Sequence, residues 1–135
     1  MQYRHLCLFA LIPCLLAARP LQIDLTCTIP APEQTIKDAS IMARLYEYDP
    51  FLADVAAKEV DRITVNGINL LSSRATSVRI PLDAERTDKH SYYVTIFVHP
   101  NAESAERLYY INGFQKVFKA ADSEVLTVTL TQKTK

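Results

Sequence analysis

Apolar and polar side chains alternate with a period of two along most of this chain, and this pattern restricts the fold more than any other feature. Segment 21–29 reads LQIDLTCTI, in which every second residue is apolar. Successive side chains of a β-strand point to opposite faces, so this segment predicts a strand with one face in a core and the other in water. Strand patterns follow at 40–48, 60–65, 77–82, 91–98, 106–111, 115–118 and 124–132.

Short strands at this spacing, separated by turn residues, are typical of a β-sandwich. We therefore predict an all-β fold, an antiparallel β-sandwich of seven to eight strands. Pro81 lies on the polar parity of segment 77–82. Proline donates no hydrogen bond to a ladder, so this strand is expected at an edge or a terminus of a sheet. Asn66-Gly67 is a turn signal that either closes a tight hairpin or begins a longer loop.

The first 18 residues have a different pattern. Arg4 precedes an apolar run from Leu6 to Ala18, which is typical of a secretory signal peptide. The run is shorter than the roughly 20 apolar residues of a membrane span. We predict a signal peptide at 1–18, cleaved after Ala17 or Ala18, and one β-sandwich domain at 19–135. A buried N-terminal strand or helix is the alternative. The mature chain is then secreted or extracytoplasmic, with no transmembrane helix.

Two of the three cysteines, Cys7 and Cys14, lie inside this first segment. Cys27 is then alone, so no internal disulfide framework is expected. It lies on the apolar parity of segment 21–29, which predicts a buried, unreactive thiol. An intermolecular disulfide is the alternative. Pro13 precedes Cys14 and Thr26 precedes Cys27, so neither cysteine resembles a lipid-attachment site.

Catalytic and nucleotide-binding motifs are missing from the sequence. With Gly67 and Gly113 as its two glycines, the chain has no Gly-x-Ser-x-Gly elbow and no glycine-rich phosphate loop. Its 15 basic and 15 acidic residues balance, whereas a nucleic-acid surface needs clustered positive charge. We therefore predict no enzyme activity, no cofactor and no nucleic-acid partner.

Metal-ligating residues also lack a suitable arrangement. His90 and His99 flank segment 91–98, and at about 3.3 Å per residue they lie nearly 30 Å apart. Four acidic residues fall near one predicted loop without the spacing of a calcium loop: Glu47, Asp49, Asp54 and Asp61. No metal site is predicted.

The stretch LYEYDPFLAD, residues 45–54, leaves a strand at Asp49-Pro50 and continues with Phe51 and Leu52. Asp49 is expected to cap a short helical turn with Pro50 at its first position. The simplest interpretation is that Phe51, Leu52 and Val55 fold back as a plug over the open end of the sandwich. The alternative is that Phe51 and Leu52 are displayed to a partner.

Several aromatic residues fall on strand faces that point away from the predicted core. Aromatic side chains are favoured at binding surfaces because they bury a large area with little loss of entropy. Cross-strand pairing that stiffens the sheet is the alternative, and we favour it. The candidate partner-binding residues are Phe51, Leu52, Tyr46, Tyr48, Tyr93 and Phe97.

The order of these segments resembles the pilotin-like envelope lipoproteins related to the type III secretion lipoprotein chaperone. The resemblance is carried by ARLYEYDPFLADVAAKEV (43–60), VRIPLD (78–83), YYVTIFV (92–98), RLYYINGFQKVF (107–118) and the terminal LTVTL (126–130). It implies a β-sandwich without catalysis. Its best-understood members act as chaperones that bind an outer-membrane secretin subunit.

The early LTC strand and the strand ending in LYEYD are also similar to secreted transthyretin-like proteins. That family implies a sandwich that binds small apolar ligands or other proteins. We therefore predict a protein-binding or chaperone-like module that acts through an edge strand or the Phe51-Leu52 segment. The alternative is a transthyretin-like carrier of a small hydrophobic ligand held between the sheets.

Overall fold

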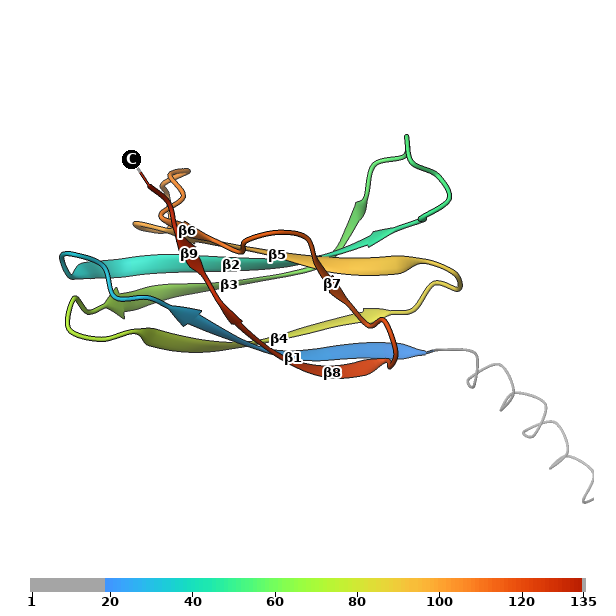
Figure 1. Cartoon of the computed structure of the whole chain (residues 1–135), viewed down its shortest axis with the longest axis horizontal. Coiled ribbons are helices and arrows are strands. Elements are labelled where there is room, and N and C mark those ends of the chain that lie inside the picture. The colour runs from blue at the N-terminus through green and yellow to red at the C-terminus, as the bar shows by residue number, and fades with distance from the viewer. Residues whose placement is uncertain (1–18, 135) are drawn as a thin grey trace, which may run out of the picture.

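Two β-sheets pack face to face in this protein, seen in a computed structural model that describes residues 19–134 (Figure 1). This part of the chain contains no helix, and the predicted all-β sandwich is confirmed. The predicted signal peptide, 1–18, lies outside the described residues. The nine strands are β1 (Pro20–Ile29), β2 (Ile36–Tyr48), β3 (Lys58–Leu70), β4 (Thr76–Glu85), β5 (Ser91–His99), β6 (Tyr109–Tyr110), β7 (Gln115–Val117), β8 (Ser123–Thr129) and β9 (Thr131–Gln132).

One sheet has the strand order β4-β1-β8, and the other has the order β3-β2-β5-β6-β9, with β7 also paired to β5. The ladders are antiparallel except that between β1 and β8, which is parallel. Strand β8 starts beside the start of β1, with Gln22 opposite Ser123 and Thr28 opposite Thr129. The expected antiparallel sandwich therefore contains one parallel pair. Alternation sets which face of a strand is buried but not the direction of its neighbour.

Segment 124–132 was expected to form one strand, and it forms two. Leu130 separates β8 from β9 and is buried, and its N–H donates to the Thr28 carbonyl at 2.8 Å. Beyond it, β9 pairs with β6 in the opposite sheet. The chain therefore crosses from one sheet to the other at Leu130 and closes that side of the sandwich.

The core lies between the sheets and follows the predicted alternation. All five apolar residues of the β1 pattern are buried, and so is every second residue of β5. Full burial of each large aliphatic side chain contributes roughly 1.5–3 kcal/mol, so these two central strands carry much of the hydrophobic stabilisation. The β1 set is Leu21, Ile23, Leu25, Cys27 and Ile29, and the β5 set is Tyr92, Val94, Ile96 and Val98.

Asn66-Gly67 does not form a turn, contrary to the expectation from its sequence. Strand β3 continues through it to Leu70, and two residues, 66 and 67, lie opposite the single residue Ser40 of β2. Gly67 has φ 71°, and the Asn66 Oδ1 atom accepts a 2.7 Å hydrogen bond from the Ser40 hydroxyl. Glycine in the left-handed region supports a bulge as well as a turn, and pairing with β2 selects the bulge here.

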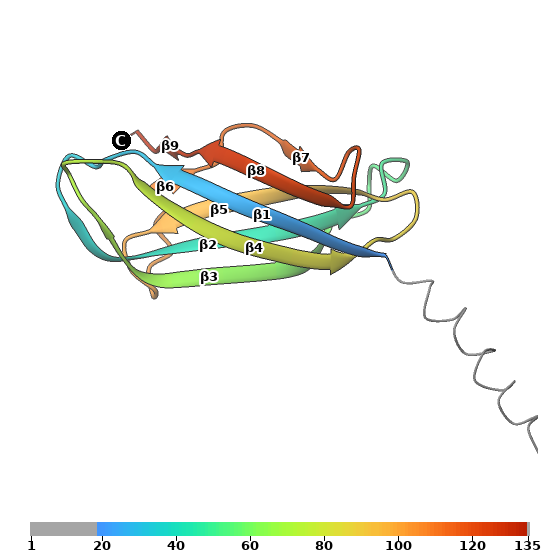
Figure 2. The same cartoon turned by 90° about the horizontal axis from the view of Figure 1, so that it is seen from below.

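Strands β3 and β4 are the edges of their two sheets and run side by side along the open side of the sandwich (Figure 2). Pro81 is exposed on β4, which confirms the predicted edge position. One carboxylate joins the two edges. The Asp61 Oδ1 atom accepts from the N–H of Arg62 on β3 at 2.8 Å, and Oδ2 accepts from the N–H of Asp83 on β4, also at 2.8 Å. Asp61 thereby occupies backbone donors that another strand would otherwise pair with.

We expect Asp61→Ala to expose both edges. Loss of two partly solvated hydrogen bonds should lower the free energy of unfolding by about 1 kcal/mol. The freed N–H groups should also promote strand pairing between molecules, seen as a concentration-dependent rise in mass by light scattering. Asp83→Ala is the matched control, because it removes an exposed carboxylate and keeps the Asp83 N–H. Equal masses for both variants would contradict the role assigned to Asp61.

Cys27 is a free thiol with no exposed surface, and this burial raises its pKa to about 12. In the native protein we therefore expect no modification of Cys27 by a thiol-directed disulfide reagent at pH 8, and complete modification in denaturant. Peptide mass spectrometry distinguishes Cys27 from the other two cysteines. Modification of Cys27 at equal rates in the two states would contradict the packing between β1 and its neighbours.

Candidate functional site

Exposed apolar side chains gather at one end of the sandwich, around the connection between β2 and β3. Among the described residues, four large hydrophobic side chains are exposed at this end, with these exposed fractions: Phe51 (84%), Leu52 (48%), Val55 (59%) and Phe114 (58%). Exposed apolar residues that occur singly are ordinary, but a contiguous group often marks an interaction surface. This end of the molecule is therefore the candidate site.

The β2–β5 register brings three tyrosines together on the outer face of the larger sheet. Tyr46 and Tyr48 point outward from β2, and Tyr46 is the cross-strand partner of Tyr93 on β5. The rings of Tyr46 and Tyr93 stack with their centroids 5.0 Å apart and their planes at 14°. Tyr48 lies 5.7 Å from Tyr93 in a tilted arrangement. The cross-strand pairing considered in the sequence is present, and it also fixes the outward rings in place.

Phe114 completes this group, and sequence reasoning missed it. Its ring lies 4.6 Å from the Tyr93 ring and 5.9 Å from the Tyr48 ring. It belongs to the segment between β6 and β7, which lies against β5 over the outer face of the sheet (Figure 1). No strand parity applies to residues 111–114, so alternation gave no indication of where Phe114 points.

We call Tyr46, Tyr48, Leu52, Val55, Tyr93 and Phe114 the aromatic patch. Five of these residues, all except Tyr46, line a surface hollow of about 270 Å³ together with Asp49, Pro50, Ala53 and Ala57 of the β2–β3 connection. Burial, with smaller repulsion from the neighbouring tyrosines, raises the pKa of the Tyr93 hydroxyl above its ordinary value. The Arg44 Nη1 group donates to the Tyr46 hydroxyl at 3.2 Å, which holds that ring at the border of the patch.

The predicted plug is wrong. Phe51, Leu52 and Val55 are exposed, and the β2–β3 connection extends away from the smaller sheet (Figure 1). Asp49 does act as a cap, with its Oδ1 atom accepting from the Phe51 N–H at 2.9 Å, but the expected helical turn does not form. The Leu52 N–H donates to the Asp49 carbonyl and the Val55 N–H to the Leu52 carbonyl, which gives two tight turns. These turns reverse the chain within the hairpin, so the apolar residues cannot reach back over the core.

Phe97 lies apart from the patch. It is opposite Met42 in the β2–β5 ladder, four residues beyond Tyr93, and the Arg107 guanidinium lies 3.8 Å from its ring centroid. Of the six candidate residues, the structure thus groups Tyr46, Tyr48, Tyr93 and Leu52. It leaves Phe51 at the hairpin tip, outside the lining of the hollow, and places Phe97 under a cation.

No protein-family model matches the chain, and no curated protein matches it. Among solved structures, it is similar to an alternative pilotin from the type II secretion system of Vibrio cholerae, with a TM-score of 0.49 and 10% sequence identity. The alignment covers 86% of this chain and 99% of that chain. The resemblance drawn from the sequence was to pilotin-like proteins linked to type III secretion. A structural similarity of this size does not assign the chain to a family. The resemblance to the pilotin-like lipoproteins therefore stays a prediction.

Residues 19–134 contain neither a candidate metal site nor a membrane-spanning helix. No group of three or more histidine, cysteine, aspartate or glutamate side chains is placed there to hold a metal ion. Glu47 contacts His90, and Asp61 binds the two strand edges, so the acidic residues near the hairpin serve different partners. None of the described segments forms a helix long and apolar enough to cross a membrane.

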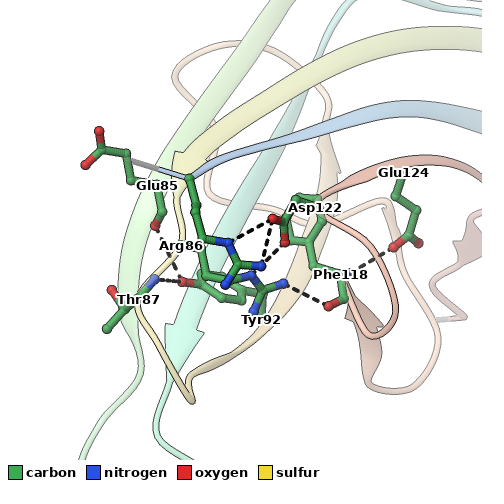
Figure 3. Close-up of polar contacts among 8 residues, drawn as sticks. Glu85, Arg86, Thr87, Tyr92, Phe118, Asp122 and Glu124 are labelled. Carbon is green, nitrogen blue, oxygen red and sulfur yellow. Dashed lines mark hydrogen bonds and ion pairs between the residues drawn. The ribbon is translucent and has the colours of Figure 1, made fainter. Parts of the chain in front are cut away.

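A polar network holds the loops beside the patch at the same end of the sandwich (Figure 3). The Arg86 Nε group donates to Asp122 Oδ1 at 2.8 Å, and Nη2 donates to the Phe118 carbonyl at 3.0 Å. Arg19 Nη2 donates to the other oxygen of Asp122 at 2.9 Å. The Tyr92 hydroxyl accepts from the Thr87 N–H at 2.8 Å. These contacts join the start of β1, the end of β4 and the β7–β8 connection.

The hydrogen bond from Arg86, helped by Arg19, holds the pKa of Asp122 below its ordinary value. A carboxylate with a lowered pKa in the folded state contributes stability above its unfolded pKa of about 3.9, and this contribution is lost as pH falls through the folded value. We therefore expect Asp122→Asn to be less stable than the wild type at pH 7, and the difference to shrink between about pH 4 and pH 2.

Urea unfolding at a series of pH values measures this difference. Asp88→Asn is the control, because Asp88 is exposed and makes no ion pair among the described residues. A constant gap between the Asp122→Asn variant and the wild type across the acid range would contradict the ionic role of Asp122.

Proposed function

We propose that this protein is a non-catalytic binding module that holds an apolar segment of a partner protein on the aromatic patch. The observation that carries the proposal is the concentration of exposed apolar side chains around one hollow, beside three tyrosine rings fixed by stacking. Aromatic and aliphatic anchors of this kind dominate the energy of protein interfaces. A chaperone-like role, in which the patch shields an apolar segment of an exported partner, is the form of this function that we favour.

The geometry of the patch supports binding at low entropic cost. Tyr93 contacts three other rings, those of Tyr46, Tyr48 and Phe114, so few of its rotamers are left to lose when a partner arrives. Leu52 and Val55 line the same hollow and lie on two successive tight turns. A surface that is already arranged for binding loses less free energy to ordering than a disordered one.

A protein partner suits the hairpin better than a lipid bilayer. Residues 49–57 read DPFLADVAA and include two carboxylates, Asp49 and Asp54, with no basic residue. Insertion of Phe51 and Leu52 into a bilayer would bring these carboxylates to a surface that is commonly anionic, where they are repelled. A protein segment with apolar residues and a nearby basic side chain satisfies both features of the hairpin.

The test is a comparison of matched substitutions. Leu52→Ser and Phe114→Ser should each weaken binding of the partner at least tenfold, a loss of about 1.4 kcal/mol. Leu52 is about half exposed, so Leu52→Ser should change the free energy of unfolding by less than about 0.5 kcal/mol. Phe114→Ser also removes ring contacts with Tyr48 and Tyr93 and should cost about 0.5–1.5 kcal/mol, which leaves the protein folded. The partner is first identified by crosslinking in the source cells, and affinities are then measured by isothermal titration calorimetry with the purified protein.

Val125→Ser is the matched control, because Val125 is 77% exposed but lies on β8 in the smaller sheet. It should leave affinity unchanged. Equal affinities for the wild type and both patch variants would overturn the proposal.

The carrier of a small hydrophobic ligand stays a separate prediction from the sequence. Native mass spectrometry of the protein purified from its source distinguishes the two functions: a retained small molecule of constant mass favours the carrier, and a co-purifying polypeptide favours the binding module.

A further inference from the structure

A hollow of about 460 Å³ lies beside the network of Figure 3, and its lining is rich in basic residues. We call it the basic hollow, after its basic lining residues Arg19, Arg86, Lys89 and Lys119. They come from three separate segments: the start of β1, the β4–β5 connection and the β7–β8 connection. Two carboxylates, Asp88 and Asp122, also line it. The four cations therefore outnumber the anions in the hollow.

The ion pairs within the hollow leave two of the cations without a carboxylate. Asp122 is shared between the guanidinium groups of Arg19 and Arg86. Within residues 19–134, neither the Lys89 nor the Lys119 ammonium lies within ion-pair distance of a carboxylate. The two lysines, together with two arginines that share a single carboxylate, give the hollow a positive potential, which attracts anions.

The wall of the hollow formed by Arg86 and Phe118 is fixed before any ligand arrives. The side chain of Arg86 is only 14% exposed, and its guanidinium lies 5.4 Å from the centroid of the Tyr92 ring. Its Nη2 group donates to the carbonyl of Phe118, while the Phe118 N–H donates to the Glu124 carboxylate at 2.8 Å. Arg86 is therefore held in one orientation, with its Nη1 group bonded to no acceptor among the described residues.

Two residues that line the hollow adopt an unfavourable backbone conformation. Lys89 has φ 65° and Phe118 has φ 57°, in the left-handed region that side chains other than glycine rarely enter. Strain of this kind persists only where surrounding contacts hold it, and it is concentrated at functional sites. For Phe118 those contacts are the bonds to Arg86 and Glu124 and the edge-to-face packing on Tyr92 at 5.9 Å.

We propose that the basic hollow binds an oxyanion, a carboxylate or phosphate group. A fixed guanidinium and two nearby ammonium groups form charge-assisted hydrogen bonds with such a group, and these are stronger than bonds between neutral groups. The hollow takes the anion between the two lysines, with Arg86 as the fixed donor at its wall. This site is independent of the aromatic patch and does not require the proposed function to be correct.

His90 places the two sites next to each other. It lines the basic hollow, and its Nδ1 atom lies 2.5 Å from the Glu47 carboxylate. Its Nε2 atom lies 4.0 Å from the carboxylate of Asp49, which lines the hollow of the aromatic patch. A partner segment that carries an acidic residue or a free C-terminus in addition to its apolar and basic residues therefore fits both sites. That link rests on the proposed function, whereas anion binding by the basic hollow does not.

The test uses nuclear magnetic resonance of the labelled protein, titrated with inorganic phosphate and separately with acetate, with chloride balancing the ionic strength. We expect saturable shifts of the backbone amides of residues 86–90 and 118–122 with at least one of the two anions. The double variant Lys89→Gln, Lys119→Gln should weaken that binding about tenfold. Lys37→Gln is the control, because Lys37 is exposed near the start of β2, outside the basic hollow, and this change should leave binding unaltered.

A second arm separates the source of the anion. An apolar peptide with a free C-terminal carboxylate is compared with the same peptide carrying a C-terminal amide, and tighter binding of the free acid indicates an anion supplied by a polypeptide. Equal binding of acid and amide, with saturable phosphate binding, indicates a free anion as ligand. Shifts that do not saturate, or that are the same in the double variant and the wild type, would overturn the proposal. Loss of peptide binding in Leu52→Ser with phosphate binding retained would show that the two sites act separately.

Discussion

Burial of alternate side chains between two sheets is the interaction on which the rest of this structure depends. Strands β1 and β5 lie inside their sheets, and each places every second side chain in the core. Because the apolar residues of these strands are fully removed from water, their register with neighbouring strands is fixed: a slip by one residue would exchange core and surface. The same register also places outward residues of neighbouring strands opposite each other, as it does for Tyr46 on β2 and Tyr93 on β5.

The two ends of the sandwich differ because of how the connections are built. At one end lie the β2–β3 hairpin, the β4–β5 connection and the β7–β8 connection (Figures 1 and 2). The shared carboxylate of Asp122 ties the last two of these to the start of β1. Within residues 19–134, the connection between β2 and β3 (49–57) makes no hydrogen bond or ion pair with the smaller sheet, and its apolar side chains stay in solvent. An apolar surface and a basic one thus lie next to each other, separated by His90.

Sequence reasoning was accurate where one physical rule decides the outcome. It predicted the buried face of β1, the core residues of β5 and the edge position of Pro81, since each follows from alternation or from the missing N–H of proline. It failed at Asn66-Gly67, where pairing with Ser40 of β2 selects a bulge over a turn. It also failed at Phe51, because the direction in which a hairpin leaves a sheet depends on strands that are distant in sequence.

Sequence reasoning predicted only those residues of the candidate site that lie on strands. Tyr46, Tyr48 and Tyr93 lie on strands, so parity alone indicated that they face outward. Phe114 and the residues of the basic hollow lie in connections, where no period applies. The residues of the basic hollow are neighbours because β1, β5 and β8 start near one another, where β4 ends. The sequence by itself determined the all-β class, the core faces and the outward rings, since these depend on the local geometry of a strand. The tertiary structure decided the parallel β1–β8 pair, the bulge at Gly67 and the meeting of separate loops, because these depend on contacts between residues far apart along the chain.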